Sequence, residues 1–390
     1  MNIQYLFSSS QGDIPLEPAQ LALPFKMTPT REHPFLTLKD YFDALGRFIL
    51  MDGGEGLLRL LEKELSRTIE ADQIKGIRIC SEKHGALYHI ARVEIGVDKP
   101  FYPFSVIAAV SPEARAHLAR ETEVLKSLQS SFDFDYLPNV FYRGDIAQQT
   151  KKEKVEISFL LGQWFEDYHE WHLTLDEERR RHRVCIWDQN NGHRFASKHE
   201  TFEIFRQASR ILTLYYDPRT YCQIYPWHHA AGDFVVKSRG EVIDIKLTTA
   251  RQYAPAMTFP EDGKSDPFIA LIYFFLNLSV KMRLDKSDGL GEMIWAGDIA
   301  LEACIRGFFQ AIELMEFQGR YGLGPVGDLL DLLKSFDSEE IMRLYQPLLG
   351  FYRKEEPEGH PIIERHLEKH AHGLCQVIQR FRTEGHPGGC

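Results

Sequence analysis

The feature that most constrains this chain is a hairpin pattern with a carboxylate at each end. An apolar run at residues 234–236 is separated by Ser-Arg-Gly from a second strand that ends at Asp244, and Asp233 stands just before the first strand. This pattern predicts a β-hairpin that can hold both carboxylates over one cleft. Mg²⁺ prefers oxygen ligands and usually takes one or two carboxylates from a protein, while phosphates supply the rest. The two acids therefore predict a nucleotide site, and the alternative is that they are turn formers or solvated strand ends.

The segment around this hairpin resembles the protein kinase superfamily. Protein kinases carry a catalytic loop H-R-D-x-x-x-x-N, a short hairpin and then a D-F-G Asp, and the aminoglycoside phosphotransferase and choline kinase branch has a similar H-G-D-x-x-x-x-N loop. Asp233 stands at the Asn position and Asp244 at the D-F-G Asp position. The sequence departs from the pattern at His228, where the catalytic Asp should be, and at Ile245 and Lys246 after the second acid. The resemblance implies an α+β, bilobal kinase-like fold with an antiparallel-sheet small lobe and a mostly helical large lobe.

The order of elements upstream agrees with a kinase small lobe. Alternating apolar and polar residues predict three strands, at residues 74–80, 86–97 and 104–110. A helical pattern follows at residues 112–129. The resemblance assigns Glu121 on this helix as the acid that pairs with the phosphate-binding Lys, with Glu123 as the second choice. An ordinary solvated helix acid is the alternative for either residue.

The third predicted strand lacks the Lys that the resemblance requires. Residues 106–110 read Val-Ile-Ala-Ala-Val, whereas a kinase Lys in this strand pairs with the phosphates and with the helix Glu. Arg92 and Lys246 are the candidates for a replacement cation. The first hairpin also lacks a G-x-G-x-x-G sequence that would cradle phosphates.

A predicted strand at residues 155–161 is followed by two aromatic residues, Trp164 and Phe165. The resemblance places the adenine of a nucleotide beside this segment, and the two rings could wall the apolar slot that holds it. Packing between the lobes is the alternative interpretation of the two rings.

Length and composition agree with a two-lobed protein. The 390 residues, of which 44% are hydrophobic, can bury a substantial core. We expect an N-terminal helical extension at residues 1–70, a kinase-like small lobe at 71–165 and a mostly helical large lobe at 166–390. Helical patterns are predicted at residues 38–50, 57–68, 199–216, 267–282, 291–317, 326–335, 338–352 and 361–381. Residues 246–259 are expected to form an activation-like or substrate-facing segment.

Charge and cysteine content exclude several classes of protein. The formal charge of −10 argues against a general nucleic-acid-binding surface, and the basic run at residues 177–183 is interpreted as a solvated helix face. The six cysteines are dispersed without a C-x-x-C pair, which argues against a zinc site and a disulfide framework. No apolar run is long enough to span a bilayer, and no secretion signal is evident. We therefore expect a cytoplasmic protein with no membrane partner.

The resemblance implies phosphoryl transfer from ATP to an unidentified hydroxyl acceptor. Asp233 and Asp244 would bind Mg²⁺, and the metal would neutralise charge on the phosphates. His228 is the candidate general base, because imidazole titrates near physiological pH, and His229 is the second candidate.

Three alternatives to phosphoryl transfer remain open at this point. The missing Lys, the absent Gly-rich loop and the altered catalytic Asp favour an inactive pseudokinase that binds a nucleotide or a partner protein. A helical scaffold without a ligand and a nucleotidyl transferase are the others. The acceptor, whether a small molecule, a protein side chain or the chain itself, is not identified by the sequence.

Overall fold

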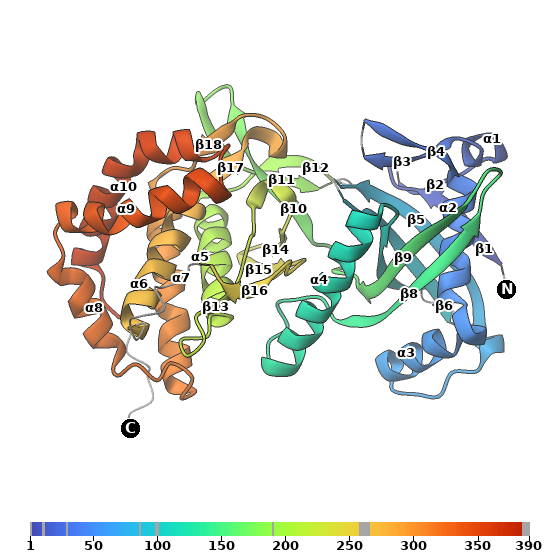
Figure 1. Cartoon of the computed structure of the whole chain (residues 1–390), viewed down its shortest axis with the longest axis horizontal. Coiled ribbons are helices and arrows are strands. Elements are labelled where there is room, and N and C mark those ends of the chain that lie inside the picture. Colours follow the sequence, from blue (N-terminus) through green and yellow to red (C-terminus); the bar gives the residue numbers. More distant parts are fainter. Residues whose placement is uncertain are drawn as a thin grey trace. The chain divides into compact units, whose positions relative to one another are not determined.

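The computed structural model describes residues 2–9, 12–28, 30–85, 87–97, 101–188, 191–256 and 266–383. It contains helices and mainly antiparallel sheets, and it divides into two compact units. Unit 1 comprises Met1–Glu166 and unit 2 comprises Asp167–Cys390. Figure 1 labels the elements of both units.

Unit 1 is built on a seven-stranded sheet with the order β2-β1-β5-β6-β7-β9-β8. All its neighbouring strands are antiparallel except β1 and β5. Its strands are β1 (Ile3–Phe7), β2 (Ile14–Pro15), β5 (Ile74–His84), β6 (His89–Val97), β7 (Phe101–Ala109), β8 (Val140–Gln149) and β9 (Lys154–Gln163). The strands predicted upstream of the hairpin are therefore confirmed, except that the second begins at His89. Ala86, where it was predicted to begin, lies outside the described residues. The N-terminal segment, expected to be helical, also supplies the first two strands of this sheet.

The described residues of unit 1 also form four helices and a two-stranded ribbon. The ribbon pairs β3 with β4, and short 3₁₀ turns lie at Met51–Gly54 and Ala71–Gln73. These elements are α1 (Pro18–Leu21), β3 (Pro24–Thr28), β4 (Arg31–Thr37), α2 (Leu38–Ile49), α3 (Glu55–Leu65) and α4 (Pro112–Ser131).

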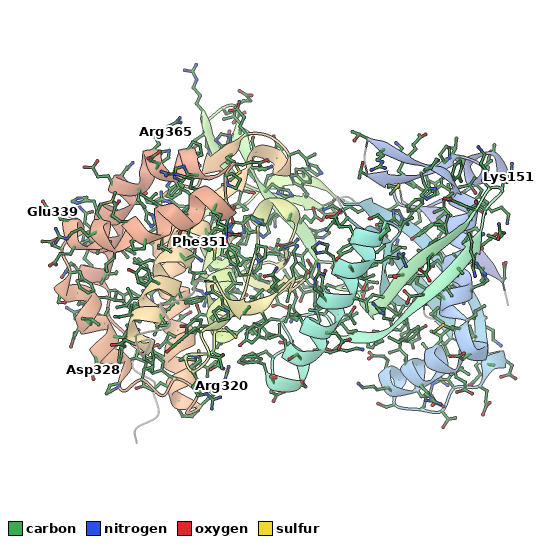
Figure 2. All side chains as sticks on the ribbon, in the orientation of Figure 1. Lys151, Arg320, Asp328, Glu339, Phe351 and Arg365 are labelled. Atoms are coloured by element: carbon green, nitrogen blue, oxygen red, sulfur yellow. The ribbon has the colours of Figure 1, made fainter. Side chains whose placement is uncertain are left out.

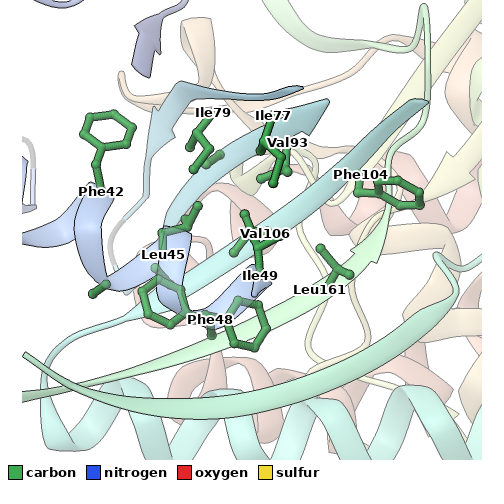
Figure 3. Packing of buried hydrophobic residues seen from close by; sticks show 14 of the residues in the cluster. Phe42, Leu45, Phe48, Ile49, Ile77, Ile79, Val93, Phe104, Val106 and Leu161 are labelled. Atoms are coloured by element: carbon green, nitrogen blue, oxygen red, sulfur yellow. The ribbon is translucent and has the colours of Figure 1, made fainter. Parts of the chain in front are cut away.

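Helix α2 fills one face of the unit 1 sheet. Thr37 caps its N-terminus. The Thr37 hydroxyl accepts from the backbone N–H of Asp40 while the Asp40 carboxylate accepts from the N–H of Thr37, which satisfies two otherwise unpaired donors. Its buried apolar side chains pack against those of β5, β6, β7 and β9, as Figure 3 shows for Phe42, Leu45, Phe48, Ile49, Ile77, Ile79, Val93, Phe104, Val106 and Leu161. Each such side chain contributes about 1.5–3 kcal/mol when it leaves water. The predicted N-terminal helix is therefore part of the core of unit 1.

Helix α4 covers the opposite face of the same sheet. Ser111 caps it by accepting from the N–H of Ala114, and Pro112 occupies its first turn, where a proline costs no hydrogen bond. Leu118 of the helix joins Ala109 and Leu160 of the sheet in a second cluster. Ala108 belongs to the α2 core, and successive residues of a strand point to opposite faces. The two helices therefore lie on opposite faces of β7.

Unit 2 contains a five-stranded antiparallel sheet with the order β12-β11-β10-β14-β15. Two further pairs join β13 with β16 and β17 with β18. The strands are β10 (His169–Asp176), β11 (Arg181–Asp188), β12 (Gly192–Phe195), β13 (Cys222–Ile224), β14 (Phe234–Arg239), β15 (Val242–Leu247), β16 (Tyr253–Pro255), β17 (Leu284–Lys286) and β18 (Met293–Trp295). The predicted hairpin is confirmed as β14 and β15, but it is one part of a larger sheet.

The interpretation of residues 177–183 as a helix face is wrong. Residues 177–180 form a turn, and Arg181 begins β11. Arg183 pairs with Asp176 at 2.7 Å between Nη1 and Oδ2. The alternating side chains of β10 and β11 pair across this turn, from Glu170 opposite Trp187 to Asp176 opposite Arg181. The charged run therefore marks a strand connection rather than a helix.

The described residues of unit 2 also form six helices, and their positions confirm the helical patterns with one exception. The helix predicted from residue 291 begins later, at Asp298, because β18 occupies the intervening segment. The helices are α5 (Lys198–Leu214), α6 (Pro267–Lys281), α7 (Asp298–Phe317), α8 (Val326–Ser335), α9 (Ser338–Glu355) and α10 (His360–Arg380). Across its described parts, the chain has no helix with both the length and the apolar character that a bilayer crossing needs.

Helices α5 and α7 pack unusually close together. A Cβ atom at Gly307 would stand 2.0 Å from the carbonyl oxygen of Arg206, so only glycine fits at this position. The hydroxyl of Ser209 donates to the carbonyl of Cys304 at 2.7 Å. This hydrogen bond joins α5 to α7.

Candidate functional site

The register of the β14–β15 hairpin separates the two predicted metal ligands. Phe234 pairs with Leu247, and Lys237 pairs with Asp244. Asp233 therefore lies four positions along the ladder from Asp244, which corresponds to about 13 Å at about 3.3 Å per residue. The expectation that the hairpin holds both carboxylates over one cleft is wrong. The residue that faces Asp233 at the open end of the hairpin is Thr248, whose N–H donates to the Asp233 carbonyl at 2.7 Å.

Asp233 is engaged by a guanidinium on both of its carboxylate oxygens. Arg251 donates from Nη1 to Oδ2 and from Nη2 to Oδ1, each at 2.6 Å, and the backbone N–H of His228 donates to Oδ2 at 2.8 Å. Asp233 is only 2% exposed. Two-point hydrogen bonding of this kind is among the stronger polar interactions in proteins. A metal ion at Asp233 would compete with Arg251 for the carboxylate oxygens.

Asp244 has a more open environment. Its side chain is 44% exposed, and Lys246 Nζ lies 3.9 Å from its Oδ2. The hydroxyl of Tyr168 donates to the same carboxylate oxygen. Lys246 itself stands opposite Val235 on the neighbouring strand. The structure thus places Asp244 near Lys246, but it does not place Asp233 near either of them.

His228 lies at the edge of a buried ionic cluster. Its Nδ1 is 3.3 Å from Nζ of Lys281 and 4.0 Å from Oε2 of Glu356, and its side chain is 39% exposed. Burial, followed by the positive charges of Lys281 and Arg251, lowers the pKa of His228 to about 3. The imidazole is therefore neutral at physiological pH, which a general base requires but does not by itself establish.

His229, the second candidate base, is a core residue. It is buried within a shell of aromatic rings, with centroid distances of 4.6 to 5.8 Å to Trp171, Phe205, Trp227 and Phe234. Burial lowers its pKa to about 3. Such a ring packs the loop against the sheet and has no surface at which to meet a substrate.

Lys281 and Glu356 were missed by the sequence reasoning. Lys281 ends helix α6 and is 2% exposed, and its ammonium pairs with Glu356 just beyond α9. The hydroxyl of Tyr225 donates to Glu356 at 3.3 Å, and Phe351 on α9, labelled in Figure 2, lies 5.7 Å from the Tyr225 ring. Burial lowers the pKa of Lys281, while Glu356 opposes that shift. A single Lys at the end of the apolar sequence of α6 was the available signal.

In unit 1, Glu121 is buried on α4 and accepts a hydrogen bond from the hydroxyl of Tyr88 at 3.1 Å. The helix follows the third strand of the predicted small lobe, as expected. Ala109, one of the two alanines at the expected Lys position, packs in the cluster beneath this helix. The structure thus places apolar packing where the resemblance requires a cation.

Arg92, proposed as a replacement cation, is already neutralised. Its guanidinium contacts Asp13 at 2.6 Å, Glu82 at 2.7 Å and Glu94, and these acids raise its pKa against the effect of burial. Its guanidinium carbon lies 5.9 Å from the centre of the Trp164 ring. Trp164 and Phe165 are half-buried and follow β9 directly. Arg92 and Trp164 therefore come together, but three acids surround the charge.

Asp13, Cys80 and Glu82 form the one group of ligand-type side chains within the described ranges that could hold a metal ion. Arg92 binds both of its carboxylates, and burial raises the pKa of the Cys80 thiol. A guanidinium thus occupies the position that a cation would take. Neither Asp233 nor Asp244 belongs to such a group.

No protein-family model matches the chain, and no curated protein has a significantly similar sequence.

Proposed function

We propose that this chain is a kinase-like protein that binds the nucleoside part of a nucleotide without Mg²⁺ and does not transfer phosphate. Support for the kinase-like character comes from the order of elements. A hairpin, a third strand and a helix with a buried Glu121 follow one another in unit 1, and in unit 2 the β14–β15 hairpin follows the long helix α5.

The main evidence against phosphoryl transfer is the contact between Arg251 and both carboxylate oxygens of Asp233. Phosphoryl transfer needs metal ions that neutralise the β- and γ-phosphates. With Arg251 on Asp233 and with Asp244 four positions away in the ladder, a two-carboxylate Mg²⁺ site cannot form at this hairpin without rearrangement. The neutralised Arg92 and the apolar packing of Ala109 support the same conclusion for phosphate binding.

The support for nucleoside binding comes from Trp164. Its half-buried ring follows β9, and an aromatic face beside an apolar strand end is a common platform for a base. Without a phosphate-binding Lys, the phosphates of ATP should add little binding free energy to that of adenosine. We therefore expect the two ligands to bind with similar affinity.

Thermal denaturation of the full chain tests this proposal, because a ligand that binds only the native state raises the melting temperature. ATP with EDTA, ATP with Mg²⁺ and adenosine should give equal stabilisation. Trp164→Leu should abolish this stabilisation. Phe101→Leu is the control, because Phe101 is an exposed aromatic residue of the same unit, and this variant should retain the stabilisation. Stabilisation that requires Mg²⁺ and is lost in Asp244→Asn would overturn the proposal, as would the absence of stabilisation by either ligand.

Phosphoryl transfer to a hydroxyl acceptor is the second candidate function, and the exposure of Asp244 favours it. A carboxylate on the hairpin with 44% of its side chain exposed is accessible to a metal–nucleotide complex. Release or transfer of the labelled γ-phosphate of ATP by the wild type, but not by Asp244→Asn, would establish this function in place of the first.

A further inference from the structure

The two ring nitrogens of His228 have different environments. Nδ1 faces Nζ of the buried Lys281 at 3.3 Å, and the ring is partly exposed. Lys281 also pairs with Glu356, which favours its ammonium form. An ammonium group has three donors and no acceptor. Nδ1 must therefore accept the hydrogen bond from Lys281.

This contact determines the tautomer of the ring. A neutral imidazole has one N–H donor and one acceptor nitrogen, so an accepting Nδ1 leaves the proton on Nε2. A second proton is disfavoured by the groups that surround the ring. These are Lys281 of α6, Arg251, His229 and Lys286 of β17, all of which lower the pKa of His228. The acids nearby, Glu356 and Asp233, are each engaged by a cation.

The backbone holds this ring in place. The N–H of His228 donates to Asp233, and Arg251 joins Asp233 to the carbonyl of Pro226 at 3.4 Å. Lys281 lies 5.8 Å from the centre of the Trp227 ring. The loop is thus anchored on both sides of His228 before any ligand binds, which reduces the cost of ordering it.

We infer that His228 is a neutral hydrogen-bond donor, through Nε2–H, to an anionic oxygen of a phosphate or carboxylate ligand, and that Lys281 is the positioning residue that fixes this tautomer. A donor in this tautomer cannot act as the general base that the sequence suggested, because Nε2 has no free lone pair and Nδ1 is engaged by Lys281. The surrounding cations favour an anion over a neutral carbonyl or hydroxyl. The inference uses contacts within unit 2 alone and does not require nucleotide binding.

Nitrogen NMR of the full chain labelled at histidine tests the tautomer directly. His228→Gln assigns the signals. At pH 7 and at pH 5.5, His228 should be neutral with the proton on Nε2. A proton on Nδ1, or an imidazolium at pH 5.5, would overturn the inference.

A pair of variants tests the role of Lys281. Lys281→Met should populate both tautomers of His228. Lys286→Met removes a nearby half-buried cation, and in this variant His228 should stay entirely in the Nε2–H form. An unchanged single tautomer in Lys281→Met would contradict the positioning role. If Lys281→Met does not fold, the wild-type spectrum still decides the tautomer.

Titration with inorganic phosphate and, separately, with acetate at constant ionic strength tests the ligand class. At least one anion should shift the His228 Nε2 signal in a saturable way. A response to phosphate alone or to acetate alone identifies the ligand chemistry. No saturable shift with either anion would overturn the assignment of an anion site. None of these outcomes depends on whether adenosine binds.

Discussion

Arg251 and Asp233 lie in a two-point ion pair, with both guanidinium nitrogens 2.6 Å from the two carboxylate oxygens. The pair holds together the loop before β14 and the segment after β15. Because Asp233 is buried and Arg251 is partly exposed, the carboxylate depends on this partner more than the guanidinium does. The acid that the sequence assigned to metal binding thus anchors the loop.

Arg251→Met should destabilise the protein by about 3 kcal/mol, because removal of one partner leaves a buried charge uncompensated. Urea denaturation measures the change. Arg239→Met is the matched control, because Arg239 is 71% exposed and its partner Asp167 is also exposed, so that its loss should cost less than about 1 kcal/mol. Equal effects of the two substitutions would contradict a structural role for the Arg251 pair.

The Lys281–Glu356 pair should behave as a coupled unit. Lys281→Met alone should cost about 3 to 5 kcal/mol, because Glu356 is left as a buried carboxylate. Adding Glu356→Gln should restore much of this loss, since the neutral amide can still accept from Tyr225. The free energies of unfolding of the two single variants and the double variant give the coupling. A double variant as unstable as the sum of the single changes would show that the residues do not interact.

The buried His370 should make stability depend on pH in a defined window. Burial lowers its pKa from 6.5 to about 3. Between these two pH values, the unfolded chain therefore binds a proton that the folded chain does not bind. Stability is then fully present above pH 6.5 and is lost as the pH falls towards 3. For each histidine with such a lowered pKa, the free energy of unfolding falls by about 1 kcal/mol for each pH unit below 6.

His370→Gln should reduce the slope of unfolding free energy between pH 6 and pH 5 by this amount, as urea denaturation at several pH values would show. Tyr345→Phe is the control, because it removes the hydroxyl that lies 3.0 Å from His370 Nε2 but keeps the histidine. It should lower stability at all pH values without changing the slope. An unchanged slope in His370→Gln would mean that the folded chain protonates this ring.

The sequence predicted regular elements well where local signals were strong. Apolar spacing predicted α2 and α4 close to their observed ends. The hairpin was predicted in the right place, but Ser238 and Arg239 belong to β14 and the turn lies at Gly240 and Glu241. The basic run at residues 177–183 was misread as helical. Its true role depends on cross-strand partners such as Asp176 and Thr174, which local composition does not reveal.

The candidate site was less predictable because it depends on register and on distant partners. Spacing placed Asp233 and Asp244 at the ends of a hairpin, but β15 continues past Asp244 to Leu247, so that the two acids do not face each other. Arg251 and Lys281 become neighbours of the His228 loop only through tertiary packing. No local pattern marks a residue 53 positions away as the partner of a histidine.

The central claim is that the hairpin holds no metal–nucleotide site. Binding of Mn²⁺ in the presence of ATP, followed by electron paramagnetic resonance, tests it most directly because the ion can replace Mg²⁺ at oxygen ligands. We predict that Asp233→Asn and Asp244→Asn give the same Mn²⁺ spectrum in the presence of ATP as the wild type, because neither carboxylate binds the ion. A protein-bound Mn²⁺ signal in the wild type that disappears in Asp244→Asn would contradict the account.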